Sequence, residues 1–317
     1  MKVLVHGTGG IDSLTVHALC RAGNETTVAA KGKRREILRE KGMQIRTHSG
    51  RKRWTDHPEV LDHEDESFFD AVFSIMQNQQ QERILETLAG VPARYLVLVG
   101  NNLKSGEMEE KLLSLGWSKE QILFGFQESA GARHQDFTEA VTFGTPNLIL
   151  GHRNRALTGK EQAFFRELFA GSCMKLTFLD DMESWYRCHA AFILPAVCLF
   201  YGHSCDLHTC SFRDITLWIR AGKDGYDFLS SIGTRIWPVG DEKNLVGIRG
   251  GILAIILWLC AKTRIGEPAV TDPVSDFHLL PAAGKDRIPI PLRLLIARAC
   301  RHPAFPGFFS PPRARSC

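Results

Sequence analysis

The sequence predicts an α/β fold, in which a doubly wound parallel sheet is followed by a mainly α-helical C-terminal domain. In the first half of the chain, short runs of β-branched residues alternate with amphipathic stretches of helical period. Such alternation is typical of parallel strands joined by right-handed crossovers. After about residue 150 the pattern changes to long apolar or amphipathic stretches that favour helices. A length of 317 residues suits two domains of roughly 100–200 residues each.

The individual elements follow from the same patterns. Apolar runs predict strands, and amphipathic stretches predict helices between them. The expected strands are 3–6, 26–30, 71–75, 95–99 and 121–124, and the expected helices are 11–22, 34–41, 79–88 and 107–115. Further on we expect a helix at 160–170, a short strand at 174–179, and helices within 182–201, 211–232 and 244–262. We place the first domain at 1–155, the second at 156–302, and a loose, proline-containing tail at 303–317.

The composition limits the classes of protein to which the chain can belong. With 44% hydrophobic and 23% charged residues, it has the balance of a soluble globular protein, and its net charge is only +4. The longest apolar runs, 190–201 and 251–261, are shorter than the ~20 residues that cross a bilayer, so we interpret them as buried core helices. We therefore expect neither nucleic acid nor a membrane as a partner.

The N-terminus and the cysteines indicate the compartment. Residues 1–5 enter a predicted strand at once, without the apolar segment of a signal peptide. The nine cysteines are scattered without the spacing of a disulfide framework. Without a secretion signal, such cysteines are expected to be reduced. The prediction is a cytoplasmic protein.

A glycine-rich turn lies between the first predicted strand and the first predicted helix. It consists of Gly7, Thr8, Gly9, Gly10 and Ile11. Gly7 permits a tight turn, and Gly9, which has no Cβ, lets the backbone approach a pyrophosphate at the positive end of the helix. Strand, turn and helix in this order predict a Rossmann-type dinucleotide-binding domain. A glycine-rich turn without a ligand is the alternative.

The next residue departs from the dinucleotide-binding pattern. The third glycine of the motif is replaced by Asp12. That glycine normally lets helix and strand pack closely, and a carboxylate near the pyrophosphate would repel it. Asp12 could instead cap the helix, because acidic residues are favoured near helix N-termini.

Basic residues at the end of the second strand indicate the cofactor. NAD sites usually carry an acidic residue here for the ribose 2′-hydroxyl, whereas NADP sites use basic residues for the 2′-phosphate. The strand runs into Lys31, Lys33 and Arg34, and no acidic residue occurs before Glu36. Cations at a helix N-terminus oppose the helix dipole, so their presence favours a bound anion. We expect NADPH rather than NADH; the alternative is a solvated, charged helix start.

Together with segments further along, these residues resemble the ketopantoate reductase family. The matching segments are 3–12, 22–42, 69–80, 96–102, 122–133, 185–197 and 288–295. The resemblance implies a Rossmann domain, a helical second domain and an active site in the cleft between them. It also implies that Gln77, Asn101 and Asn102 border the nicotinamide and the substrate. A simple turn is the alternative for the two asparagines.

The helix that carries catalysis in this family differs here. Ketopantoate reductases use a lysine of the second domain's first helix as general acid, followed by an asparagine on the same face. Residues 185–192 contain neither, but they contain Arg187 and His189, and the resemblance is closer to a sub-group with a histidine in this helix. His189 can protonate the alkoxide that forms when a ketone is reduced, and Arg187 can orient a substrate carboxylate. A core histidine and a surface arginine are the alternatives.

These inferences combine into one prediction and one alternative. We expect an NADPH-dependent oxidoreductase that reduces a small 2-oxo acid or related ketone, with Asn102, Arg187 and His189 at the catalytic centre and no metal. The alternative is a catalytically degenerate NADPH-binding sensor or interaction protein. The segment 203–210 offers four possible zinc ligands, but they are too closely spaced for a regular tetrahedral site. The apolar helices suit either a monomer core or a homodimer interface.

Overall fold

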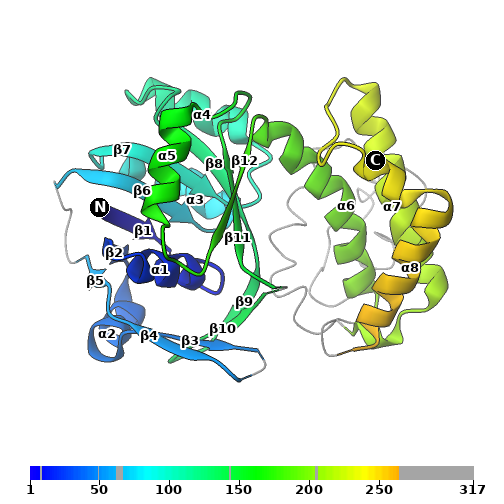
Figure 1. The fold of residues 1–317 in the computed structure, drawn as a ribbon, viewed down its shortest axis with the longest axis horizontal. Helices are drawn as coiled ribbons and strands as arrows, with labels where there is room; N and C mark the ends of the chain where they lie inside the picture. Colours follow the sequence, from blue (N-terminus) through cyan, green and yellow to red (C-terminus); the bar gives the residue numbers. More distant parts are fainter. Residues whose placement is uncertain (8, 49, 62–66, 143, 204–205, 264–317) are drawn as a thin grey trace, which may run out of the picture. The chain divides into compact units, whose positions relative to one another are not determined.

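The computed structural model describes residues 1–263 apart from positions 8, 49, 62–66, 143 and 204–205. The chain separates into two compact units, Met1–Glu183 and a second unit that begins at Ser184 (Figure 1). Each unit has its own cluster of buried apolar side chains.

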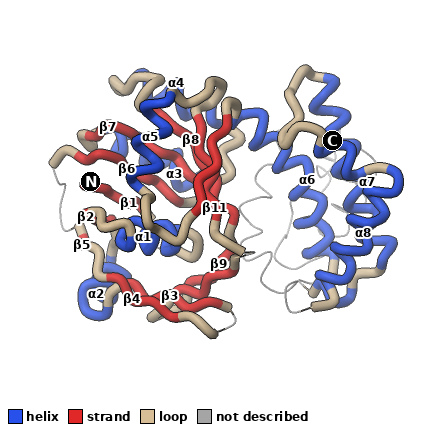
Figure 2. Tube along the Cα trace, viewed as in Figure 1, coloured by secondary structure: helices blue, strands red, loops and turns tan. Residues whose placement is uncertain are grey.

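The first unit is built on an eight-stranded sheet with the order β12-β11-β8-β7-β6-β1-β2-β5 (Figure 2). Its strands are β1 Lys2–His6, β2 Glu25–Ala29, β5 Glu59–Val60, β6 Phe69–Ile75, β7 Ala93–Val99, β8 Ile122–Glu128, β11 Asn147–Gly151 and β12 Lys175–Leu179. Neighbouring strands run parallel except β8 and β11. The predicted α/β sheet is confirmed as parallel-dominated. The strict parallel alternation fails at this pair because no crossover helix joins β8 to β11.

Helices cover both faces of this sheet. They are α1 Asp12–Arg21, α2 Gly32–Lys41, α3 Asn78–Ala89, α4 Ser105–Ser114 and α5 Gly159–Leu168. Side chains of α1 and α5 share one apolar cluster, whereas α3 and α4 pack against each other behind the sheet (Figure 1). The strand order runs outward in opposite directions from β1 and β6. Right-handed crossovers then place the helices on opposite faces and leave a topological switch point between these two strands.

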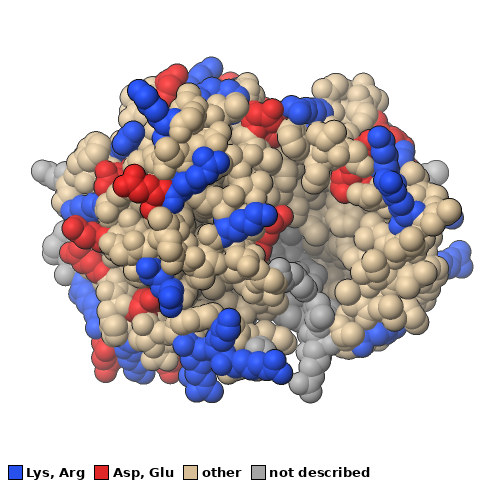
Figure 3. All heavy atoms as spheres, viewed as in Figure 1, with Lys and Arg blue, Asp and Glu red and all other residues tan. Residues whose placement is uncertain are grey.

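A second, smaller sheet of order β4-β3-β10-β9 belongs to the same unit. Its strands are β3 Met43–Thr47, β4 Arg53–Asp56, β9 Ala130–Arg133 and β10 Thr138–Val141. β3 and β4 form an antiparallel hairpin with exposed Arg51, Lys52 and Arg53, and Figure 3 shows basic side chains gathered at this end of the unit. The sequence did not predict these strands, because each is short and β10 pairs with a strand far away in the chain.

The first unit ends later than the boundary near residue 155 that the sequence suggested. α5 and β12 both follow residue 155, yet β12 pairs with β11 and α5 packs on the sheet. Both elements therefore belong to the first unit, which extends to Glu183. The functional roles given to the two domains stay predictions.

The described part of the second unit is helical, as predicted. It contains most of α6 Met182–Gly202, then α7 Phe212–Ser231 and α8 Gly247–Ala261, with 3₁₀ turns at Leu207–Thr209 and Asp241–Leu245. A hydrogen bond from Trp218 Nε1 to the Phe192 carbonyl oxygen, 2.8 Å long, ties α7 to α6. The predicted tail at 303–317 lies outside the described residues.

The apolar run in α8 is only partly buried, which corrects its interpretation as a core helix. Ala254 and Ala261 are buried, whereas about half of the surface is exposed at Ile252, Ile255, Ile256 and Leu259. Leu253, Leu257 and Trp258 are partly buried and pack with Ala254 on the apolar cluster of the second unit, so the helix has one packed side and one exposed apolar side. Within the described part of the chain, no helix combines the length and apolar character needed to cross a membrane.

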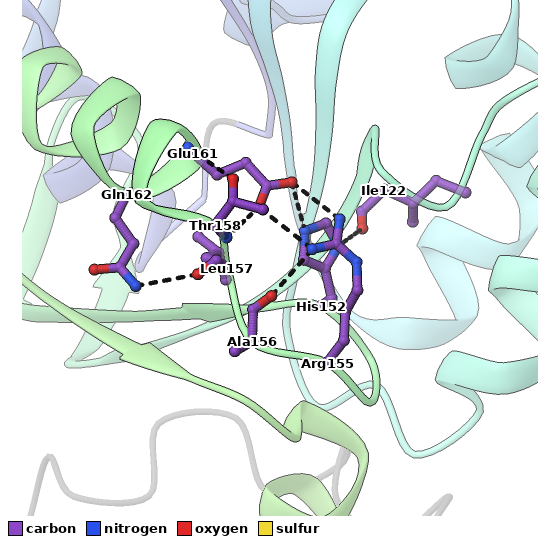
Figure 4. A network of polar contacts seen from close by, with 8 residues as sticks. All are labelled: Ile122, His152, Arg155, Ala156, Leu157, Thr158, Glu161 and Gln162. Atoms are coloured by element: carbon purple, nitrogen blue, oxygen red, sulfur yellow. Dashed lines mark hydrogen bonds and ion pairs between the residues drawn. The ribbon is translucent and has the colours of Figure 1, made fainter.

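A buried polar network fixes the start of α5 (Figure 4). Glu161 accepts hydrogen bonds from the Thr158 backbone N–H at 2.6 Å and from Arg155 Nη2 at 2.9 Å. His152 lies 3.0 Å from the same carboxylate and 2.8 Å from the Ile122 carbonyl oxygen. Burial opposes the charge of Glu161, but these hydrogen bonds outweigh it and lower its pKa to about 2. The carboxylate is therefore a structural anion that caps the helix.

An ion pair anchors α1 to β4. His17 is 2% exposed, its Nδ1 lies 2.8 Å from Asp56 Oδ2, and its ring is 4.8 Å from that of Trp54. Burial lowers the pKa of His17, but the hydrogen bonds to Asp56 and Cys173 outweigh burial and raise the pKa to about 9. His17 is thus charged at neutral pH.

Replacing His17 with glutamine is expected to lower the free energy of unfolding by about 3 kcal/mol more at pH 6 than at pH 10. The folded-state pKa is raised above its ordinary value of 6.5 to about 9. The stabilisation is therefore fully present below pH 6.5 and is lost as the pH rises through 9. Urea unfolding of wild type and His17→Gln across this range measures the difference, and a pH-independent difference would contradict the ion pair.

Candidate functional site

The carboxyl ends of the central strands bring the predicted site segments to one edge of the sheet. His6 of β1 pairs with Ala29 of β2 and Ser74 of β6, and Ser74 pairs with Leu98 of β7. The segments that follow these strands therefore emerge side by side. They are the glycine turn, the basic start of α2, the Gln77 turn and Asn101–Asn102. Ligands of open α/β sheets bind at this edge, at the switch point.

The glycine turn fits tightly against the end of β6. Gly7 has φ +133°, a conformation that L side chains rarely adopt, and a Cβ there would overlap the Ile75 carbonyl oxygen. The turn is also enclosed from β9, since a Cβ on Gly131 would lie 2.6 Å from the Gly10 carbonyl oxygen. Ile11 precedes α1 and is 37% exposed. Thr8 lies outside the described residues.

Asp12 occupies the centre of this turn. It is 3% exposed, and its carboxylate accepts hydrogen bonds from the N–H of Gly9 at 2.6 Å and of Ser13 at 3.0 Å. Burial raises the pKa of Asp12 to about 6, although these hydrogen bonds and the nearby charge of Arg34 act to lower it. Asp12 thus closes the turn through its bonds with Gly9 and Ser13 and places a carboxyl group at the start of α1; its effect on a pyrophosphate stays a prediction.

Side chains that the sequence did not single out hold the start of α1. The Ser13 hydroxyl donates to the Gly9 carbonyl oxygen at 2.8 Å and lies 3.0 Å from the Thr138 hydroxyl of β10. Gln127 of β8 donates to the Ile11 carbonyl oxygen at 2.8 Å. The contacts with Thr138 and Gln127 join residues more than 100 positions apart, so no local sequence signal could reveal them.

The basic residues after β2 lie at the start of α2, as predicted. Lys31 is the N-cap residue, and Lys31 and Lys33 are exposed. Arg34 is only partly exposed, and its three guanidinium nitrogens are buried without a hydrogen-bond partner among the described residues. Burial lowers the pKa of Arg34; the charge of Asp12 opposes this shift and that of Arg133 adds to it. A buried guanidinium without a partner is costly and suits a site that receives an anion.

The last residue of β1 adds a group that sequence reasoning missed. His6 Nε2 is buried without a hydrogen-bond partner among the described residues. Burial, with the nearby charge of Lys31, lowers the pKa of His6 to about 4. A neutral imidazole therefore lies at the switch point. Its position after three apolar strand residues was the only sequence signal.

The polar residues after β6 and β7 have different roles. Asn102 is fully buried, and its Nδ2 donates to the Leu98 carbonyl oxygen at 3.0 Å, so this amide supports the strand end. Asn101 beside it is partly exposed. Gln77 is the N-cap residue of α3, and its Oε1 accepts a 2.8 Å hydrogen bond from Gln79.

Gln81 is a further buried amide at this edge. Its Nε2 donates to the carbonyl oxygens of Ser74 at 2.7 Å and Val99 at 3.0 Å. It thereby bridges β6 and β7 just where the loops leave the sheet. The run of glutamines is visible in the sequence, but the sequence does not show which of these side chains turns inward.

The two catalytic candidates of the second unit lie on different sides of α6. Residues two apart on a helix point about 200° away from each other. His189 stacks on Trp185 with ring centroids 5.0 Å apart, whereas Arg187 Nη1 donates to Thr234 Oγ1 at 3.4 Å. Burial lowers the pKa of His189 to about 4. The imidazole is therefore neutral at pH 7 in this structure.

The segment 203–210 is explained by local contacts. His203 lies 2.8 Å from the Thr209 hydroxyl and 3.3 Å from the carboxylate of Asp214, and Cys210 is buried. Ser204 and Cys205 lie outside the described residues. In the described part of the chain, no group of three His, Cys, Asp or Glu side chains could hold a metal ion.

Most of the first unit matches a known protein family. The family described as Ketopantoate reductase PanE/ApbA matches residues 3–155, which span the glycine turn and the strands β1 to β11. Residues 3–155 are a ketopantoate reductase PanE/ApbA domain. The predicted resemblance is thereby confirmed for this part of the chain.

Individual relatives agree with the ketopantoate reductase domain. The chain is 28% identical over 171 residues to the uncharacterized oxidoreductase YkpB of Bacillus subtilis strain 168; the match covers 52% of this chain and spans about half, 54%, of that relative. Among solved structures, D-mandelate dehydrogenase with NADH and anilino(oxo)acetate is similar at a TM-score of 0.72 and 15% identity, covering 95% of this chain and 98% of that one. The 2-dehydropantoate 2-reductase from Methylococcus capsulatus is similar at a TM-score of 0.68 and 13% identity, covering 94% and 95%. At such identities, the structural likeness shows the fold.

Replacing Gly7 with alanine is expected to destabilise the reductase domain by about 3 kcal/mol or more, because the new Cβ would meet both an unfavourable φ and a backbone oxygen. Gly9→Ala is the matched control, since its Cβ would find only the Asp12 side chain at 3.4 Å, and it should cost less than about 1 kcal/mol. Thermal and urea unfolding measure both. Equal effects would contradict the tight turn at Gly7.

Proposed function

We propose that the chain is an NADPH-dependent reductase that acts on the carbonyl of a small 2-oxo acid or related ketone. The observation that carries the proposal is the glycine turn between β1 and α1, whose backbone at Gly7 leaves room only for glycine, within a ketopantoate reductase domain. Such a turn, at the carboxyl end of a parallel strand and the N-terminus of a helix, is suited to a dinucleotide pyrophosphate.

The cofactor would be held by residues from four segments of this edge. Thr8, Gly9, Gly10 and Ile11 would offer backbone N–H groups to the pyrophosphate. Lys31, Lys33 and Arg34 would bind the 2′-phosphate, and the buried, unpartnered guanidinium of Arg34 supports this assignment. Gln77 and Asn101 would border the nicotinamide, and Asn102 holds the end of β7 through its hydrogen bond to Leu98.

The reaction needs a proton as well as a hydride. The bound cofactor supplies the hydride to the carbonyl carbon, and the developing alkoxide needs a proton donor. We assign that donor to His189 and the substrate carboxylate anchor to Arg187. The pKa of His189 is lowered to about 4 by burial, and a bound carboxylate would raise it toward the working pH.

The NADPH preference is tested by fluorescence titration with NADPH and NADH. Wild type should bind NADPH more tightly than NADH, and Arg34→Ala should weaken NADPH binding about 10- to 100-fold while changing NADH binding less than about twofold. Arg39→Ala, an exposed arginine of the same helix, is the matched control and should leave both dissociation constants unchanged. Equal binding of the two cofactors by wild type would refute the assignment of the basic residues.

The proton donor is tested by steady-state kinetics with a panel of 2-oxo acids. His189→Gln should lower kcat about 100-fold or more while leaving NADPH binding unchanged. Wild-type kcat should fall as the pH rises through the pKa of the histidine in the complex, and this limb should be missing in the variant. His208→Gln, a histidine in the second unit outside α6, is the control. An unchanged pH profile in His189→Gln would assign the histidine to the core instead.

One alternative has a specific observation in its favour. A cofactor-binding sensor without catalysis would bind NADPH but oxidise it with no ketone. The carboxylate of Asp12 within the glycine turn and the absence of the family's lysine and asparagine from residues 185–192 favour this alternative. The kinetic panel distinguishes it, because a sensor retains the titration and shows no turnover.

The proposal also includes a small-molecule substrate as the partner and a homodimer as the oligomeric state. The half-exposed isoleucines and leucine of α8 suit the homodimer considered from the sequence. Light scattering coupled to gel filtration gives the mass in solution.

A further inference from the structure

We propose that Asp12 acts as an internal anion in the glycine turn, so that a dinucleotide binds only with uptake of a proton by this carboxylate. The inference rests on the proposed dinucleotide binding and adds a regulation of the same site. It makes cofactor affinity depend on pH through a residue that replaces the third glycine of the motif.

The first argument is geometric. The N-terminus of a helix leaves backbone N–H groups without partners, and these are the groups that bind phosphate. Here the carboxylate of Asp12 already accepts from the N–H of Gly9 at 2.6 Å and of Ser13 at 3.0 Å. Each N–H carries one proton, so Gly9 cannot donate fully to Asp12 and to a pyrophosphate at once.

The second argument is the confinement of the side chain. Asp12 is 3% exposed. A Cβ on Gly7 would lie 2.6 Å from Asp12 Oδ2, so the carboxylate already fills the space beneath the turn. The carboxyl group therefore has little room to turn away when an anion arrives, and losing its charge is the simplest way to remove the repulsion.

The third argument concerns the charges around Asp12. The charge of Arg34 in α2 lowers the pKa of Asp12. The exposed Arg133 of β9 is close enough for its charge to lower the pKa of Arg34. On β1, His6 is neutral at pH 7, because burial and the charge of Lys31 lower its pKa to about 4. The contacts that other elements make with the turn, from Thr138 of β10 and Gln127 of β8, are uncharged.

The guanidinium of Arg34 makes no hydrogen bond to Asp12 and is thus available to an incoming phosphate. When Arg34 binds the phosphate, its positive charge is neutralised by the ligand and stabilises the charged form of Asp12 less. Removing that cation makes the protonated form of Asp12 more favourable, so ligand binding and proton uptake support each other.

The range of the effect follows from the pKa of Asp12, which burial raises to about 6. At pH 7, roughly one molecule in ten carries the proton, and each further pH unit reduces that fraction about tenfold. Affinity for the dinucleotide should therefore fall about tenfold per unit above pH 6.

The test compares wild type with Asp12→Asn by NADPH titration from pH 5.5 to 8.5. Asparagine keeps the acceptor oxygen for Gly9 but carries no charge. The ratio of the two dissociation constants cancels the titration of the cofactor's own 2′-phosphate. We expect a ratio within about threefold of one at pH 5.5 that rises about tenfold per unit above pH 6.5. Asp70→Asn, at the start of β6 where the side chain accepts from the Lys2 N–H at 2.8 Å, is the matched control and should follow wild type.

Calorimetry in two buffers of different ionisation enthalpy gives an independent readout. At pH 7, binding to wild type should take up close to one proton more than binding to Asp12→Asn. Should the asparagine variant fail to fold in thermal unfolding, Asp12→Gly restores the glycine of the motif and serves in its place.

The outcomes separate the two proposals. NADPH binding with a flat ratio and no difference in proton uptake overturns the role of Asp12 and leaves the reductase proposal intact. No binding of NADPH or NADH to wild type and either variant at any pH overturns dinucleotide binding, and the inference on Asp12 with it.

Discussion

The close approach of the glycine turn to the end of β6 is the constraint on which the candidate site depends. β1 and β6 are parallel neighbours, and the chain leaving β1 must pass over the Ile75 carbonyl to enter α1. Only a residue without Cβ and with positive φ passes there. Because the turn is fixed in this way, the N-terminus of α1 lies at the switch point, and the residues after β2, β6 and β7 surround it.

Electrostatics at this edge is unusual because each charged group lacks the partner expected for it. The guanidinium nitrogens of Arg34 are buried and have no hydrogen-bond partner among the described residues, while the nearby carboxylate of Asp12 accepts hydrogen bonds from backbone N–H groups instead. In a structure built only for stability, these two side chains would form an ion pair. In the proposed complex, this separation leaves positive charge to bind a phosphate and negative charge at the place where the pyrophosphate would lie. Such frustration is a feature of binding sites rather than of cores.

The sequence predicted local structure well and non-local structure poorly, for physical reasons. Strands such as β1 and helices such as α1 were found within about two residues, because their periodicity and caps are encoded locally. β9, β10 and β11 were missed, since short strands gain their stability from partners far along the chain. β11 is also where the parallel pattern breaks, and no local signal records strand direction.

The residues of the candidate site divide in the same way, into those that local sequence signals reveal and those that depend on non-local structure. Gly7, Lys31 and Arg34 could be found because motif spacing and charge are visible in the sequence. The buried state of Asn102, the bridging role of Gln81 and the neutral imidazole of His6 follow from sheet register. Nor could the sequence tell that Arg34, rather than its neighbour Lys33, turns inward.

Protonation links the two halves of the proposed chemistry. Burial shifts the pKa values of both His189 and Asp12 in the direction of the neutral form. At neutral pH the imidazole of the free protein is neutral and is therefore a weak proton donor, whereas most Asp12 carboxyl groups are still charged and oppose an incoming anion. In the proposed complex, a substrate carboxylate would raise the pKa of His189 again and favour the imidazolium, and a pyrophosphate would raise the pKa of Asp12 further and favour the protonated carboxyl. The protonation states of the free fold and those that the proposed complex needs are then compatible, because the ligands themselves would change them. The departures of this chain from the ketopantoate reductase pattern, a carboxylate in the glycine turn and a histidine in α6, are thus consistent with a reductase whose competence is created by ligand binding.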